Sequence, residues 1–142
     1  MAVRDGNQLY NPNGTVVQEK DHIKYLGALV SKTGDINSEL GRRIGYGKQE
    51  LSALRTIWNQ SNITLRRKVE IYQSCIVSKL LYGLQSLWLS KSQCKRLNGF
   101  YCACLRKISR IPHSFISHVT NAEVLQKTKM TPLANTLLQQ QL

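Results

Sequence analysis

The chain has 142 residues, enough for one domain with its own core, and its 42% hydrophobic content is ordinary for a globular protein. No stretch approaches the ~20 apolar residues of a membrane span, and the polar start is not a secretory signal, so we expect a nuclear or cytoplasmic protein. Lysine and arginine number 20 against 8 acids, a formal net charge of +12, which favours nucleic acid, then an acidic membrane, as partner.

Most of the positive charge lies in the middle of the chain. Residues 35–113 hold fourteen bases and four acids, a net charge of +10, whereas residues 1–34 and 114–142 each carry +1. A local excess of this kind is typical of a surface that contacts polyanions. The alternative is a solvated basic surface on a structural or protein-interaction bundle.

The first part of the chain predicts short β-strands. Leu9-Tyr10 and Thr15–Val17 flank the turn sequence Asn11–Gly14, in which proline presets φ and glycine accepts a positive φ. A second apolar run, Ile23–Val30, is rich in strand-forming residues and ends at Ser31–Gly34. These strands are too few for a complete sheet, so we expect the edge of something larger.

From Asp35 the apolar period becomes helical. Its stripe consists of Ile36, Leu40, Ile44, Gly47, Leu51, Leu54 and Trp58. Gly41 and Gly45 lie on the opposite flank beside Lys48 and Arg55, although a glycine inside a helix costs about 1 kcal/mol relative to alanine. Two interpretations stay open: a bare strip that a phosphate backbone approaches closely, or tight packing of another helix.

A second helix is predicted to begin after Thr64 as its N-cap. Its apolar stripe consists of Leu65, Val69, Tyr72, Ile76, Leu80, Gly83 and Leu87. Arg66, Arg67 and Lys68 occupy its first turn, where the helix dipole disfavours cations. We expect either a phosphate contact or a solvated basic run at this helix end.

The third helix opens with Ser90 and Gln93 in capping-box spacing and ends before Pro112. Leu97, Tyr101, Cys104, Leu105 and Ile108 form its apolar face, and Lys91, Lys95, Arg96, Arg106, Lys107 and Arg110 occupy the other side. Thr120 with Glu123 predicts a further capped helix, to about Lys129. A last segment starts at Thr131, and its pattern is interrupted at the end of the chain.

Together these patterns predict a mainly α fold. We expect a strand or hairpin segment over residues 1–34, a basic bundle of three longer helices over 35–112, and short C-terminal helices over 113–142.

The residue types needed for catalysis are not in a suitable arrangement. None of the eight acids forms the close pair that two-metal chemistry requires, and the three histidines have no evident nucleophile partner. A zinc module is the competing hypothesis, since Cys94, Cys102, Cys104, His113 and His118 lie within 25 positions. Their spacing lacks a Cys-x-x-Cys turn, so we predict reduced thiols, no catalytic residue and no metal site.

From Tyr25-Leu26-Gly27 onward, the chain resembles the segment that follows the catalytic palm in non-LTR (LINE-like) retrotransposon reverse transcriptases. The features that carry the resemblance are Tyr25-Leu26-Gly27, Gly34, Glu39 with Arg42-Arg43-Ile44, Leu54 with Ile57-Trp58, Ile63, Leu80-Leu81-Tyr82-Gly83, Leu97 with Phe100, Cys104-Leu105-Arg106 with Ile108, and Asn121 with Glu123-Val124. One departure is that Gln85-Ser86-Leu87 precedes Trp88, where the family has Glu-x-Trp.

The resemblance implies a primer-grip and thumb region of an RNA-directed DNA polymerase. The paired aspartates and their Mg²⁺ would belong to a palm outside this chain. A primer-grip-like turn at Tyr25, Leu26 and Gly27 would hold the primer, and a helical thumb would clamp the template–primer duplex of RNA or DNA. The implied phosphate contacts are Lys48, Arg55, Arg66, Arg67, Lys95 and Arg106. The implied partners are this duplex and the rest of the polymerase, without a membrane.

Overall fold

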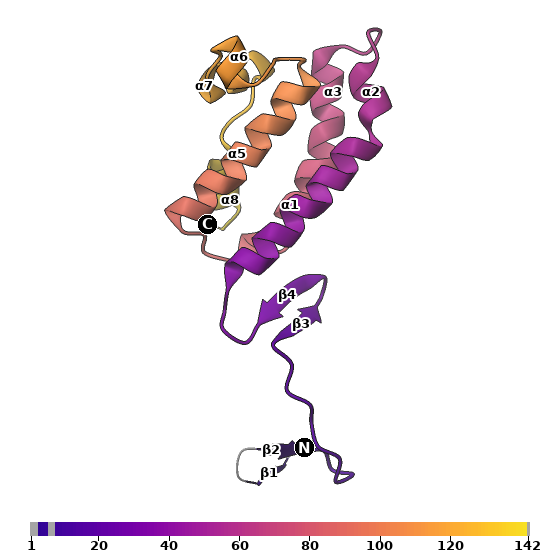
Figure 1. The fold of residues 1–142 in the computed structure, drawn as a ribbon, viewed down its shortest axis with the longest axis vertical. Coiled ribbons are helices and arrows are strands. Elements are labelled where there is room, and N and C mark those ends of the chain that lie inside the picture. The colour runs from indigo at the N-terminus through magenta and orange to yellow at the C-terminus, as the bar shows by residue number, and fades with distance from the viewer. Residues whose placement is uncertain (1–2, 6–7, 142) are drawn as a thin grey trace. The chain divides into compact units, whose positions relative to one another are not determined.

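The computed structural model describes residues 3–5 and 8–141, and its fold is mainly α, as predicted (Figure 1). The chain divides into two compact units, Met1–Asp35 and Ile36–Leu142. The first contains short strands and the second contains the helices.

The N-terminal unit contains two antiparallel hairpins. Strand β1 (Val3–Asp5) pairs with β2 (Gln8–Tyr10), and β3 (His22–Tyr25) pairs with β4 (Ala28–Ser31). The strand predicted over Thr15–Val17 is reduced to one isolated bridge, between Tyr10 and Val16.

The run Ile23–Val30, whose composition is strand-forming throughout, is the second hairpin, and its turn lies where the resemblance implies one. Tyr25 pairs with Ala28, so Leu26 and Gly27 form a two-residue turn, with φ values of 46° and 81°. Tight hairpin turns need positive φ at both central positions, which glycine adopts freely and leucine adopts rarely. Gly27 therefore permits the turn that divides the run into two strands. A single glycine among strand-forming residues is a weak sequence indication of such a turn.

The first predicted helix is two helices, α1 (Ile36–Ala53) and α2 (Arg55–Asn59), separated at Leu54. The buried Trp58 donates its indole N–H to the Leu51 carbonyl at 2.9 Å. Lys68, also buried, donates from Nζ to the carbonyls of Trp58 and Gln60 at 2.9 and 2.6 Å. Tertiary groups thus satisfy the backbone around this break, which the continuous apolar stripe does not reveal.

The second predicted helix is also interrupted. Thr64 is its N-cap, as predicted, and accepts a hydrogen bond from the Arg67 backbone N–H. Helix α3 (Leu65–Tyr72) continues as a π-helical turn, η1 (Gln73–Val77), and then as α4 (Ser78–Leu81). Gly83, at φ 80°, ends the run before a short 3₁₀ turn, η2 (Leu84–Ser86).

Helices α5 (Lys91–Ile108) and α7 (Asn121–Thr128) begin where the sequence predicts. Helix α5 follows the Ser90–Gln93 capping box, and α7 follows the Thr120–Glu123 capping box. Between them lies α6 (Ser114–Ser117), and α8 (Leu133–Gln141) comes last.

The core of the helical unit lies between α1, α5 and the α3–α4 run. Helices α1 and α5 run parallel, and α3–α4 runs antiparallel to both (Figure 1). The rings of Tyr72 and Tyr101 meet at the centre with centroids 5.7 Å apart. Helices α7 and α8 pack against α5, and their Val124, Leu133 and Leu137 belong to the same buried cluster.

Candidate nucleic-acid interface

Exposed bases and small residues lie along the shared outer side of α1–α2 and α5, which we call the α1–α5 face. The bases of this face are Lys48, Arg55, Arg96, Lys107 and Arg110, and its small residues are Gly41, Gly45, Ser52 and Ala103. Within α1 and within α5 these positions recur at intervals of three, four or seven, so each set follows one side of its helix. Arg55 begins α2, and Arg110 lies just beyond the end of α5. None of these described positions holds an acid.

Contacts between the two helices place the bases side by side. At one end, the Arg96 guanidinium lies 3.6 Å from the position that a Cβ of Gly41 would take. Near the middle, burial raises the pKa of the Cys104 thiol to about 11, while the ammonium groups of Lys107 and Lys48 act against that rise. Both lysines therefore lie within electrostatic reach of one buried thiol, although they come from different helices.

At the other end, the face holds a pocket of about 410 Å³ lined by Ser52, Arg55, Trp58, Asn59 and Lys107. Two cations from different helices share this pocket with hydroxyl and amide groups. Arg110 donates to the Asn59 carbonyl and joins the end of α5 to α2. Convergent cationic and neutral donors are what a phosphate oxygen requires.

The three glycines of α1 differ in their surroundings, and Gly41 lies beside α5, where a Cβ would be in ordinary contact with Arg96. A Cβ on Gly47 would meet the Phe100 ring at 2.9 Å, so this glycine permits helix packing. A Cβ on Gly45 would meet nothing within 4 Å. Of the two interpretations of the bare strip, Gly45 therefore fits close approach by something outside the described chain.

Arg66 and Arg67 lie exposed in the first turn of α3. Arg67 donates to Glu70 at 3.0 Å, and Arg66 donates to the other carboxylate oxygen at 3.3 Å. The Arg67 hydrogen bond is the largest cause that holds the pKa of Glu70 below its ordinary value. This intrahelical partner accounts for cations at a helix N-terminus without a bound phosphate, so we leave both arginines out of the face.

The expectation for Arg106 needs a correction, because its side chain is buried. The guanidinium donates to the carbonyls of Pro112 and Val119 at 3.3 and 2.6 Å and to the Asn121 side chain at 3.1 Å. These acceptors lie in the segment leading to α7, which covers this side of α5. Arg106 therefore holds that segment against α5, and its buried guanidinium is not accessible to a phosphate. Lys95 is exposed but projects about 100° away from Arg96, outside the α1–α5 face.

The predicted grip residues belong to the N-terminal unit. Tyr25 and Leu26 are exposed, at 66% and 76%, and Gly27 is half-buried. They form the β3–β4 turn, whose place relative to the helices is not defined.

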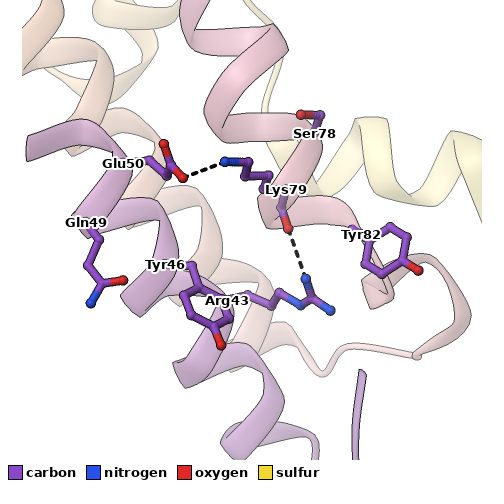
Figure 2. A pocket seen from close by; sticks show the side chains of 7 residues that line it. All are labelled: Arg43, Tyr46, Gln49, Glu50, Ser78, Lys79 and Tyr82. Atoms are coloured by element: carbon purple, nitrogen blue, oxygen red, sulfur yellow. Dashed lines mark hydrogen bonds and ion pairs between the residues drawn. The ribbon is translucent and has the colours of Figure 1, made fainter. Parts of the chain in front are cut away.

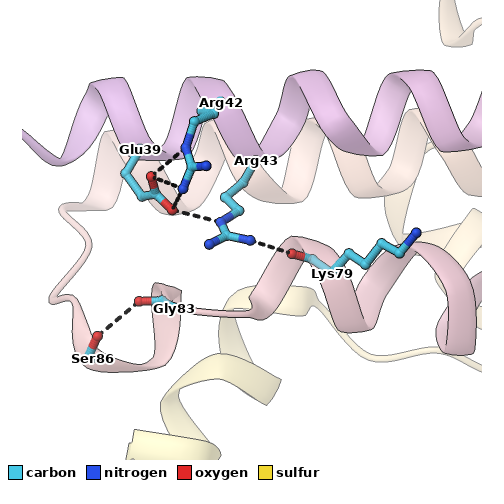
Figure 3. Close-up of polar contacts among 6 residues, drawn as sticks. All are labelled: Glu39, Arg42, Arg43, Lys79, Gly83 and Ser86. Carbon is cyan, nitrogen blue, oxygen red and sulfur yellow. Dashed lines mark hydrogen bonds and ion pairs between the residues drawn. The ribbon is translucent and has the colours of Figure 1, made fainter. Parts of the chain in front are cut away.

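A buried ionic network joins the Glu39 motif of α1 to Lys79 of α4, next to the Leu80–Gly83 motif (Figure 3). Glu39 accepts from Arg42 at 2.7–2.9 Å and from Arg43 Nε at 2.7 Å. Arg43 donates to the Lys79 carbonyl at 3.3 Å, and its guanidinium carbon lies 5.1 Å from the centroid of the Tyr82 ring. The Glu39 motif of α1 therefore holds the end of α4, which makes this network structural.

Sequence reasoning did not single out Arg96, Lys107 or Arg110, although it placed them on the basic side of their helix. The signal for Arg96 and Lys107 is the spacing of positions 96, 103 and 107 on one side of α5. Arg110 lies beyond the end of α5, and its bond to the Asn59 carbonyl is formed only in the folded chain. The sequence pattern does not show that α1 and α5 lie side by side, and the shared face depends on that packing.

Two other site classes were sought over the described ranges, 3–5 and 8–141. No group of three or more His, Cys, Asp or Glu side chains is arranged to hold a metal ion there. None of the helices in those ranges has the length and apolarity to cross a membrane.

Comparison with known proteins supports an origin related to transposon reverse transcriptases. The chain is similar to a probable RNA-directed DNA polymerase from transposon BS of Drosophila melanogaster, with 28% identity over 103 residues. The match covers 70% of this chain and 11% of that protein, so the chain spans a small part of its relative's length. No protein-family model and no solved structure matches the chain.

Proposed function

We propose that this chain is a thumb-like, nucleic-acid-binding part of a non-LTR retrotransposon reverse transcriptase. The α1–α5 face lies along the backbone of the template–primer duplex, with Lys48, Arg55 and Lys107 at phosphates. Catalysis belongs to a palm outside this chain, where Mg²⁺ would be bound. The relative's name, an RNA-directed DNA polymerase, supports this class of parent protein.

The observation that carries the proposal is the α1–α5 face itself. Five bases from α1, α2 and the α5 segment share it without an acid, and the backbone at Gly45 is left bare. Phosphate contacts position a duplex without reading its sequence, which suits an enzyme that copies any template. The β3–β4 turn at Tyr25-Leu26-Gly27 is proposed to contact the primer strand.

The proposal predicts binding that is independent of sequence and falls steeply with salt. Three phosphate contacts give a slope of log affinity against log salt of about −2.7, a roughly 40-fold loss between about 50 and 200 mM salt. Fluorescence anisotropy with a labelled blunt RNA–DNA hybrid measures this slope. Absence of binding at the lower salt, or binding unchanged by salt, would contradict the proposal.

A protein-interaction role is the second candidate, and a different surface favours it. Phe115 and Ile116 of α6 are adjacent in sequence and 87% and 71% exposed, and clustered exposed apolar side chains are one mark of a protein-interaction surface. In a polymerase, this surface would face the remainder of the protein. Substituting both residues with serine should leave nucleic-acid affinity unchanged and weaken association with the rest of the polymerase.

A further inference from the structure

A second pocket, of about 530 Å³, lies on the side of α1 that faces α4 (Figure 2). Arg43, Tyr46, Gln49 and Glu50 line it from α1, and Ser78, Lys79 and Tyr82 line it from α4 and its C-terminal end. It is separate from the α1–α5 face, which occupies another flank of the same helix.

Two tyrosine rings of this pocket are held in place yet remain open to solvent. The guanidinium carbon of Arg42 lies 5.5 Å from the Tyr46 ring centroid, and that of Arg43 lies 5.1 Å from the Tyr82 ring centroid. Tyr46 is 43% exposed and Tyr82 is 55% exposed. A cation held against a ring restricts its orientation, and the solvent-exposed part of each ring is a surface on which a planar group can stack.

The charges around the pocket are paired within the chain. Lys79 contacts Glu50 at 2.5 Å, and Arg43 is bonded to the buried Glu39 and to the Lys79 carbonyl. An anion would have to break one of these pairs, so a free phosphate is a poor ligand for this site. A neutral, planar group suits it better.

The polar groups at the edge of the pocket match the hydrogen-bonding edge of a nucleobase. Gln49 offers an exposed amide with both a donor and an acceptor, and the Glu50 carboxylate can accept from an exocyclic amine. The Ser78 hydroxyl donates to the Ser74 carbonyl at 2.5 Å, so its own lone pairs remain as acceptors. Aromatic stacking with a few polar contacts is how unpaired bases are bound.

We propose that this pocket binds one unpaired nucleobase from a single-stranded extension of the duplex on the α1–α5 face. The inference rests on the proposed function, because that face supplies the duplex. Gly45 immediately precedes Tyr46, and Gln49 lies one turn further along α1. The bare surface at Gly45 gives the strand a path across the helix, from the bases on one flank to the rings on the other.

The test compares a blunt duplex with one that carries a short overhang, each measured by anisotropy with the full chain. Stacking is worth about 1–3 kcal/mol per base, so the overhang should raise affinity roughly 5- to 150-fold. A fluorescent adenine analogue, 2-aminopurine, placed in the overhang should lose fluorescence when it stacks. The Tyr46→Ser/Tyr82→Ser variant should lose both effects and keep its affinity for the blunt duplex.

The matched control is Tyr46→Phe/Tyr82→Phe, which keeps both rings and should keep both effects. Circular dichroism establishes that each variant is folded. Equal affinity for the two duplexes, or quenching that survives the serine changes, would overturn the pocket and leave the proposed function intact.

If neither duplex binds at low salt, the proposed function fails instead. A single-stranded oligonucleotide containing 2-aminopurine then decides the pocket by itself. Tyrosine-dependent quenching would support a base site, and its absence would overturn one.

Discussion

At the scale of single residues, the buried carboxylate of Glu39 is a sensitive point of the structure. Its side chain is 1% exposed, and the Arg43 side chain bonded to it is 7% exposed. Burying a charge is costly unless a partner of opposite charge accompanies it. Removing the Glu39 carboxylate would leave the buried Arg43 guanidinium without the anion that it contacts at 2.7 Å.

The Glu39→Gln variant should therefore be less stable by about 3–5 kcal/mol, the range for breaking a buried ion pair from one side. Urea denaturation followed by circular dichroism measures the free energy of unfolding. Glu50→Gln is the control, because its partner Lys79 is 58% exposed and such pairs contribute about 0–1 kcal/mol. Equal losses in the two variants would refute the structural role of the network.

The four cysteines are free and differ in burial, which gives a second test. Cys102 and Cys104 are buried, whereas Cys75 and Cys94 are half-buried. Burial raises the pKa of Cys104 to about 11, so at pH 8 roughly one thiol in a thousand is ionised. A thiol reagent at pH 8 should modify Cys75 and Cys94 first, and the other two only after urea unfolds the chain. Four equal rates in native protein would contradict this core.

Residue types alone did not separate Arg106 from its basic neighbours. An arginine on a helix is expected to be exposed unless another segment packs over it. Here the segment from Pro112 to Asn121 packs over Arg106 and accepts its hydrogen bonds. Which arginine is covered depends on contacts between positions up to 15 apart, and helical spacing carries no information about them.

At the scale of elements, helix starts were predictable and helix breaks were not. Thr64, Ser90 and Thr120 each cap a helix through bonds to residues three positions on, so a local pattern suffices. The break at Leu54 is supported by Trp58 and Lys68, and η1 preserves the apolar face while changing the hydrogen-bond step. The break at Leu54 thus involves Lys68, which folding brings close to α2.

Helix α1 offers a matched pair of glycines for an element-scale test. Gly45→Ala should stabilise the protein by up to about 1 kcal/mol, because its Cβ enters open space and alanine favours helix. Gly47→Ala gains the same preference but must displace the Phe100 ring, and overpacking costs about 1–3 kcal/mol. The difference should exceed about 1 kcal/mol by urea denaturation. The reverse order would mean that α1 and α5 do not approach each other at Gly47.

At the scale of the whole molecule, the sequence predicted a mainly α, basic protein with strands at its start. These properties follow from amino-acid composition and from the periodicity of apolar residues, and each of these averages over many positions, so a few atypical residues do not change the prediction. The shared face of α1 and α5 was not predictable, because it requires knowing that helices distant in sequence lie side by side. Of the six predicted phosphate contacts, Lys48 and Arg55 belong to that face.

The central claim is that the positive charge acts through one face and not merely through its total. The most direct measurement is the affinity of two charge-reversed variants for a blunt RNA–DNA hybrid at about 50 mM salt. Lys48→Glu/Lys107→Glu alters the α1–α5 face, whereas Lys127→Glu/Lys129→Glu makes the same change in net charge at the end of α7. The first variant should lose about 100-fold or more in affinity and about two units of salt slope, and the second should lose less than about fivefold. Equal losses in both variants would contradict the account, because total charge alone would then explain binding.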